Sequence, residues 1–286
     1  MHSRGDFVEK VFVQNLSILV TDSCNFNCRH CMRGNIKGCE ISDETIDNIF
    51  NKIQLICNLC ICGGEPLMAL DRIKRIFDVI MRKGIIINQY GFATNGTQYK
   101  EKVVNELFDV FEEYVKSFSD RFYGDGQLPN GKTHGYIDLS WDEYHKEQLL
   151  LLKQINPNLY EEYLEKIRQL QESKYFSGYR TITQRLFDEG YAKELTIKKS
   201  KLIEIKKYYT NHDDVLFFGP IIGIAQNGMI TECNGSYDTL KDKYNYGNIN
   251  DDNIIDVIQN ISTKCKSLKQ WDKKIESSIR KYTKYK

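Results

Sequence analysis

The chain has 286 residues, of which 41% are hydrophobic and 28% are charged. This composition is typical of an ordinary globular protein and excludes a disordered chain, and no stretch approaches the 18 uninterrupted apolar residues of a membrane-spanning helix. The net charge of +1 gives no electrostatic reason to expect a nucleic-acid partner.

Short β-branched runs alternate with longer helical periods in the first half of the chain, which favours βα units around a parallel sheet. Ser42 is a typical helix N-cap, and Pro66 is the residue type preferred in a first helical turn. The expected strands are 16–20, 56–62, 85–92 and 136–140, with helices starting near Ser42, at Pro66 and after the Asn95-Gly96 turn.

The second half gives a weaker pattern. We expect a long polar loop at 120–135, two helical segments separated at Pro157, and a further strand within 215–225. The stretch 175–199 supports no clear assignment, because its apolar residues are sparse. The lysine-rich end, 264–286, is expected to form an exposed helix or tail, with weak docking of an acidic partner as the alternative.

The start of the chain and the cysteine count indicate a compartment. The first ten residues, MHSRGDFVEK, lack the apolar core of a signal peptide. Nine cysteines in a chain of this length favour a reducing environment over a disulfide framework. We therefore expect a cytoplasmic protein with no membrane partner.

Three cysteines, Cys24, Cys28 and Cys31, follow the first expected strand within eight residues. Thiolates placed so closely on loop backbone can hold three corners of an iron–sulfur cube and leave the fourth iron open. A zinc site that uses Cys39 as a fourth ligand is the alternative. The spacing therefore indicates a metal site with two possible occupants.

A second motif, Gly63-Gly64-Glu65-Pro66, follows the second expected strand. Glycine lets a ligand approach the backbone closely, and Glu65 offers a carboxylate acceptor. The alternative interpretation is a plain strand-to-helix turn with an acidic residue placed favourably for the helix dipole.

Together, CNFNCRHC and GGEP resemble the signature of the radical S-adenosylmethionine (radical SAM) superfamily, over about Asn15 to Gly228. The resemblance implies an α/β fold, a partial (β/α)6 TIM-like barrel over residues 1–226, with the site at the C-terminal ends of the strands. It implies a [4Fe-4S] cluster on the three cysteines and S-adenosyl-L-methionine (SAM) on the fourth iron. The implied reaction is reductive cleavage of SAM to a 5′-deoxyadenosyl radical, which abstracts a hydrogen atom from substrate.

The same resemblance assigns further cofactor contacts. It places His30 beside the adenine, the GGEP residues and Thr94-Asn95 near the cofactor, and Ser140 and Asp142 on its ribose or methionine portion. From the residues alone, His30 is also compatible with a polar loop position, Thr94-Asn95-Gly96 with a simple turn, and Ser140 with a helix N-cap. The run 217–228 aligns loosely with a later strand of the family.

Other residues have competing interpretations. Tyr144 and His145 follow Asp142 and are candidate proton donors or radical-quenching groups, although such residues are more often structural. Cys60 and Cys62 share one face of a strand and are expected, with Cys57, to pack as small hydrophobes. A second cluster built from these cysteines and Cys233 is the alternative.

The C-terminal part, 227–286, is expected to be a short cap or tail. Segments 228–234 and 247–249 resemble the opening hairpin of a SPASM/twitch-like extension. Because only Cys233 and Cys265 lie in this part, we expect no auxiliary cluster.

Three functions compete. The first is radical chemistry on a peptide, as in maturation of a ribosomally made peptide, and the second is the same chemistry on a small-molecule metabolite. Both need an electron donor such as flavodoxin or ferredoxin. The third is a non-catalytic iron–sulfur protein that transfers electrons or acts as a sensor.

Overall fold

The computed structural model describes residues 10–34, 38–118, 131–181, 186–187, 190–196, 199–200, 206–212, 215–231 and 245–265. Most of the expected loop at 120–135, Cys233, and nearly all of the lysine-rich end lie outside these ranges. No helix in the described ranges is both long enough and apolar enough to cross a membrane.

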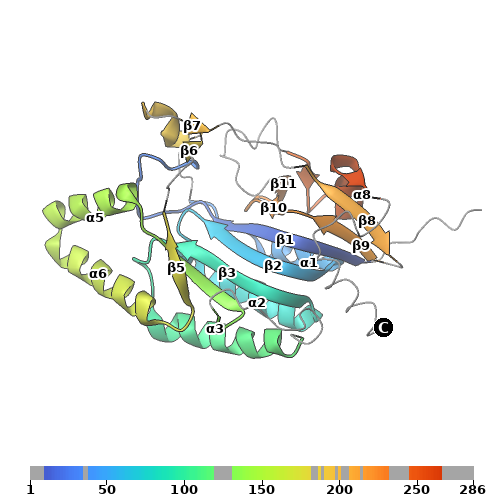
Figure 1. The fold of residues 1–286 in the computed structure, drawn as a ribbon, viewed down its shortest axis with the longest axis horizontal. Coiled ribbons are helices and arrows are strands. Elements are labelled where there is room, and N and C mark those ends of the chain that lie inside the picture. Colours follow the sequence, from blue (N-terminus) through green and yellow to red (C-terminus); the bar gives the residue numbers. More distant parts are fainter. Residues whose placement is uncertain are drawn as a thin grey trace, which may run out of the picture.

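Strands and helices alternate from β1 to β5, as the sequence pattern predicts (Figure 1). The elements are β1 (Lys10–Thr21), α1 (Asp43–Lys52), β2 (Ile53–Gly63), the 3₁₀ turn η1 (Pro66–Ala69), α2 (Leu70–Lys83), β3 (Ile86–Thr94), α3 (Glu101–Lys116), β4 (Gly135–Ser140), α5 (Glu143–Ile155), α6 (Pro157–Glu172) and β5 (Phe176–Arg180). The helix expected at Pro66 begins instead as a 3₁₀ turn, and its α-helical part starts at Leu70.

The parallel strands β1 to β5 lie side by side in chain order, and β9 (Val215–Gly219) and β10 (Ile222–Ile224) pair in parallel with the other side of β1. This mostly parallel, open α/β sheet confirms the expected fold class. The C-terminal ends of β1 to β4 meet at one edge of the sheet, which is where parallel α/β folds place their sites.

The strand expected over 215–225 is divided in two. Pro220 and Ile221 separate β9 from β10, and the bond between Gly219 and Pro220 is cis. Proline has no N–H to donate to a ladder, so pairing with β1 stops at Val13 and resumes at Leu16. The two short strands therefore occupy a single position in the sheet.

Antiparallel strands and a short helix complete the described C-terminal part. They are β8 (Tyr208–His212), β11 (Met229–Thr231), β12 (Gly247–Asn248), α8 (Ile254–Ile261) and β13 (Thr263–Lys264), while β6 (Leu186–Phe187), η2 (Gly190–Glu194) and β7 (Lys199–Ser200) precede them. β11 and β12 extend the main sheet beyond β10. The boundary between a core over 1–226 and a cap over 227–286 stays a prediction.

The helices α2 and α3 lie along one face of the sheet (Figure 1). α2 buries Ile73, Phe77 and Ile80 at helical spacing and ends at Gly84, which has the left-handed conformation (φ 66°) that glycine adopts without strain. The rings of Phe77 and Phe111 stack with their centroids 3.9 Å apart. This packed layer holds the strands, and hence the residues at their ends, in a fixed arrangement.

Candidate active site

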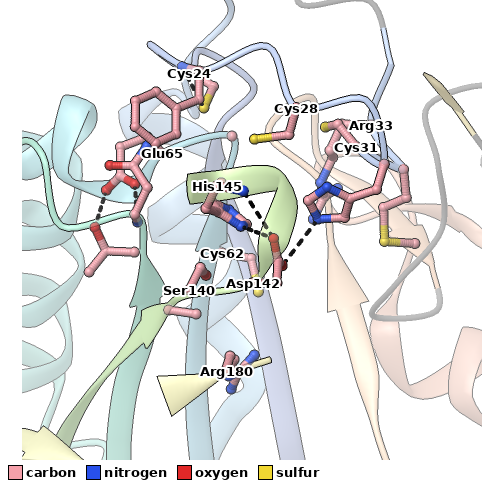
Figure 2. Close-up of a pocket in the computed structure, with 18 of the residues that line it drawn as sticks. Cys24, Cys28, Cys31, Arg33, Cys62, Glu65, Ser140, Asp142, His145 and Arg180 are labelled. Carbon is pink, nitrogen blue, oxygen red and sulfur yellow. Dashed lines mark hydrogen bonds and ion pairs between the residues drawn. The ribbon is translucent and has the colours of Figure 1, made fainter. Parts of the chain in front are cut away.

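The loop that follows β1 carries Cys24, Cys28 and Cys31 and is called the cysteine loop. A cavity of about 590 Å³ lies between this loop and the C-terminal ends of β2, β3 and β4. Figure 2 shows Cys24, Cys28 and Cys31 on the loop above it and Ser140, Cys62 and Arg180 below. The cavity gathers every residue predicted for the cluster and the cofactor except Pro66, and Tyr144 also does not line it.

The cysteine loop is held at both ends by hydrogen bonds. The Thr21 hydroxyl accepts from the Ser23 N–H at 3.0 Å, and the Asp22 carboxylate accepts from the Cys39 N–H at 2.7 Å. Burial raises the pKa of the Cys24 thiol to about 12, and it also raises that of Cys28. Ionising these thiols therefore requires a compensating positive charge, which a bound metal supplies.

The spread of the three thiols can be compared with the two metal interpretations. A tetrahedral zinc would draw its sulfur ligands to about 3.8 Å from one another, given a Zn–S bond of about 2.3 Å. Among the described residues, the single group of potential ligands within 4.8 Å of one another is His30, Asp142 and His145, without the cysteines. The three sulfurs are therefore not gathered around one point as a zinc ion would require, and they are compatible with separate corners of an iron–sulfur cube.

Gly64 is needed for a contact that the sequence did not indicate. Its N–H bonds the Thr21 carbonyl at 2.9 Å, and the next N–H, of Glu65, bonds the Ser23 carbonyl at 2.8 Å. A β-carbon at Gly64 would lie 2.3 Å from that Ser23 oxygen, well inside contact distance. The glycine thus lets the end of β2 lie against the residue that precedes Cys24.

Glu65 is buried and joins the ends of β2 and β3. Its carboxylate accepts from the Thr94 hydroxyl at 2.6 Å, the Asn95 N–H at 2.7 Å and the Leu67 N–H at 3.0 Å (Figure 2). Burial raises its pKa, while these three hydrogen bonds act in the opposite direction. A carboxylate offers about four acceptor positions, so about one remains for an ammonium donor.

The Thr-Asn-Gly segment is more than a turn. The Asn95 side-chain amide donates to the side-chain oxygen Oδ1 of Asn25 at 3.0 Å, and the Asn25 side-chain amide donates to the Thr97 hydroxyl at 2.8 Å. Asn25 is the residue after Cys24. The end of β3 therefore positions the cysteine loop through the side-chain amides of Asn95 and Asn25.

Asp142 is the N-cap of α5, where its side chain accepts from two backbone N–H groups. The alternative of Ser140 as this N-cap is therefore wrong, and the Ser140 side chain lies half-buried in the cavity wall. Asp142 also bonds His145 Nδ1 at 2.7 Å and lies 3.5 Å from His30 Nε2 (Figure 2). Tyr144 stacks on the His30 ring at 4.5 Å.

His30 Nδ1 is buried and has no hydrogen-bond partner among the described residues. Burial lowers the pKa of this imidazole to about 4. A neutral ring with one unpaired nitrogen at a cavity wall fits a ligand that supplies the missing partner.

Among the cavity residues outside the motifs, four carry a charged or thiol side chain whose place in the site was not predicted from the sequence. Arg33 follows the cysteine motif, Cys60 and Cys62 precede GGEP, and Arg180 ends β5. The alternation of Cys60 and Cys62 on one strand face was a usable signal, whereas Arg180 falls in the stretch that supported no assignment.

A family model described as the Radical SAM superfamily matches residues 18–185, more than half of the chain. The protein therefore belongs to the radical SAM superfamily, whose members are enzymes with a [4Fe-4S] cluster and SAM as cofactors. The cysteine triad, the unpaired His30 nitrogen and the free acceptor of Glu65 fit these two groups. Membership also confirms the expected enzyme class over a non-catalytic iron–sulfur protein.

Individual relatives match only parts of the chain. A GTP 3′,8-cyclase of Staphylococcus saprophyticus is 33% identical over 109 residues, which cover 34% of this chain and 31% of that protein. The radical SAM cyclopropyl synthase TigE of Paramaledivibacter caminithermalis is 24% identical over 167 residues, which cover 50% of this chain and 34% of that protein. The chain thus matches about a third of the length of each of these relatives.

A solved structure described as native anSMEcpe with bound AdoMet and Cp18Cys peptide is 14% identical, with a TM-score of 0.45. The match covers 87% of this chain and 80% of that chain.

Proposed function

We propose that this protein removes a hydrogen atom from an unactivated carbon of a peptide. When bound, the cluster and SAM supply a 5′-deoxyadenosyl radical through reductive cleavage of SAM, and the protein supplies position and exclusion of water. The observation that carries the proposal is one cavity that joins three metal-ligand thiols to a buried carboxylate, Glu65, at the ends of adjacent strands.

Several of the predicted residues would hold the cofactors. Cys24, Cys28 and Cys31 hold three irons. The remaining acceptor of Glu65 binds the SAM ammonium, and the Ser140 hydroxyl supplies a further polar contact from β4. Asp142 is largely engaged in capping α5 and in holding His145.

His145 is a candidate proton-transfer group. Its Nδ1 donates to the Asp142 carboxylate at 2.7 Å, which leaves Nε2 as an acceptor, and its side chain lines the cavity. Tyr144 packs on His30 instead, so we assign it a positioning role.

The peptide assignment is supported by β5. Among the described residues β5 pairs with β4 on one side, and it lies at the end of the strand order. Tyr179 and Arg180 of this strand line the cavity. A peptide that adds to the open side of β5 would form backbone hydrogen bonds and lead a side chain into the cavity.

A small anionic metabolite is the second candidate. Arg33 and Arg180 line the cavity and could bind a phosphate or carboxylate. The similarity to a GTP 3′,8-cyclase over about a third of the chain supports this class.

The test is anaerobic reconstitution with iron and sulfide, followed by SAM and dithionite. Formation of 5′-deoxyadenosine supports the function, and its absence from protein that holds about four irons contradicts it. Mass spectrometry of a synthetic peptide library then tests the peptide assignment, with GTP as the small-molecule arm. Conversion of GTP with every peptide unchanged would replace the first candidate by the second. Reduced flavodoxin or ferredoxin in place of dithionite tests the proposed electron donor.

A further inference from the structure

Two thiols outside the cluster motif share the cavity. Cys60 and Cys62 lie on one face of β2 because strand residues two apart point the same way. Their sulfur atoms are 3.7 Å apart, and both residues line the cavity that contains Cys24, Cys28 and Cys31. Figure 2 shows Cys62 beneath Asp142 and His145, on the side of Arg180.

The surroundings make Cys62 the more acidic of the two thiols. The Ser17 hydroxyl lies 3.1 Å from the Cys62 sulfur. The hydrogen bond from Cys60 lowers the pKa of Cys62, with Arg33, Ser17 and Arg180 acting in the same direction and burial opposing them. The bond to Cys62 and burial raise the pKa of Cys60. Cys62 therefore loses its proton before Cys60.

We propose that Cys60 and Cys62 together form a hydrogen-atom donor for a carbon radical held in this cavity. The inference rests on the proposed function, because that reaction creates the radical. The S–H bond is weaker than an ordinary C–H bond, so transfer from a thiol to a carbon radical is favourable. The alcohol and amide hydrogens of Ser140, Thr94 and Asn95 in the cavity wall are held too strongly to be transferred.

The donor step transfers one hydrogen atom. The S–H bond of Cys60 breaks and a C–H bond forms on the substrate, which leaves an unpaired electron on the Cys60 sulfur. The Cys62 thiolate shares this electron through a partial S–S bond. One electron from a reduced ferredoxin- or flavodoxin-type carrier and one proton from water then restore the thiol and the thiolate.

The strand geometry permits this approach of the two sulfurs. Residues two apart on a strand have α-carbons about 6.6 Å apart. Disulfides span α-carbon distances of about 4.4–6.8 Å, so the pair lies near the upper end of the range that can be bridged. The product class follows: the carbon that loses a hydrogen regains one from the thiol, as in inversion of a stereocentre.

The first test needs no cofactor. We would treat the protein without its cluster with diamide, a two-electron thiol oxidant, and digest it with trypsin. Cleavage after Lys52 and Arg72 releases one peptide, 53–72, that contains Cys57, Cys60 and Cys62. We expect a loss of two hydrogens from this peptide, with Cys57 still open to alkylation. Alkylation of both Cys60 and Cys62 after oxidation, or a link to Cys57, would overturn the inference.

The second test uses SAM alone as the probe. Reconstituted protein is reduced with dithionite in D₂O without added thiols, and 5′-deoxyadenosine is analysed by mass spectrometry. The S–H group exchanges with solvent, so we expect one deuterium in the product from the wild type and from Cys39→Ser, which alters an exposed cysteine. Cys60→Ser should lose most of this deuterium, and Cys62→Ser should lose part of it.

The outcomes separate the two proposals. Labelled 5′-deoxyadenosine from Cys60→Ser at the wild-type level, or unlabelled product from the wild type, contradicts the hydrogen-donor inference and leaves the proposed function intact. Absence of 5′-deoxyadenosine from every variant contradicts the proposed function and the inference together.

Discussion

Two groups of cysteines share the cavity and are held in opposite ways. Cys24, Cys28 and Cys31 lie on irregular backbone, positioned by side-chain bonds such as that from Asn95 to Asn25. Cys60 and Cys62 lie on a central strand, where the register pairs Cys60 with Ser17 on one side and Gly91 on the other. A loop can adjust to a cluster that has its own geometry, whereas a strand fixes the distance between two reacting groups.

The largest contrast should appear in metal content. Cys28→Ala removes one of three cluster ligands, so we expect iron after reconstitution to fall close to zero. Cys60→Ala removes a thiol from the same cavity and should retain the wild-type iron content. Iron and sulfide analysis measures both, and equal loss in the two variants would contradict the division between loop and strand cysteines.

The anchoring of the loop depends on Glu65. Glu65→Gln places an amide where a carboxylate accepts three hydrogen bonds, which leaves a buried donor unpaired and should lower the free energy of unfolding by about 1–3 kcal/mol. Glu113→Gln, at an exposed site on α3, is the control and should change it by less than about 0.5 kcal/mol. Urea unfolding of protein without its cluster is the measurement. Equal stability of the two variants would show that Glu65 does not join the strand ends.

The glycines of GGEP provide a matched pair. A β-carbon at Gly64 would meet the Ser23 oxygen at 2.3 Å, whereas one at Gly63 meets its nearest neighbour at 3.1 Å. Gly64→Ala should lower the free energy of unfolding by about 1–3 kcal/mol and reduce iron uptake. Gly63→Ala should have a smaller effect on both. The reverse order, measured by urea unfolding and iron analysis, would contradict the packing of β2 against the loop.

The smallest expected effect concerns the amide bridge from β3 to the loop. Asn95→Ala removes the hydrogen bond to Asn25 and should lower the free energy of unfolding by about 1 kcal/mol. We also expect the cluster to lose iron faster to a chelator, because the loop is less restrained. Asn158→Ala, at an exposed position on α6, is the control. Equal rates of iron loss in the two variants would remove this role of Asn95.

The sequence predicts the site where its signal is local. The spacing of Cys24, Cys28 and Cys31 predicts the metal ligands without knowledge of the fold, and the GGEP tetrapeptide predicts the strand end. The partners of Glu65 are not predictable in this way, because Thr94 and Asn95 approach it only when β2 and β3 pair.

Two fold features were missed for physical reasons. β5 is a mostly exposed strand at the end of the strand order, so it lacks the apolar alternation that marks a half-buried strand. The run 215–225 has continuous β-forming character, and its interruption at Pro220 depends on how two short segments pair with one long strand. The places of Arg180 and Cys62 in the cavity could not be predicted either, because they depend on the same kind of tertiary contact.

The most direct test is the electron paramagnetic resonance spectrum of the reduced, reconstituted protein with and without SAM. Three protein thiolates leave one iron for the amino and carboxylate groups of SAM, so we expect the spectrum to change when SAM is added. A cluster signal that SAM leaves unchanged, or a bound zinc ion in place of the cluster, would contradict the account.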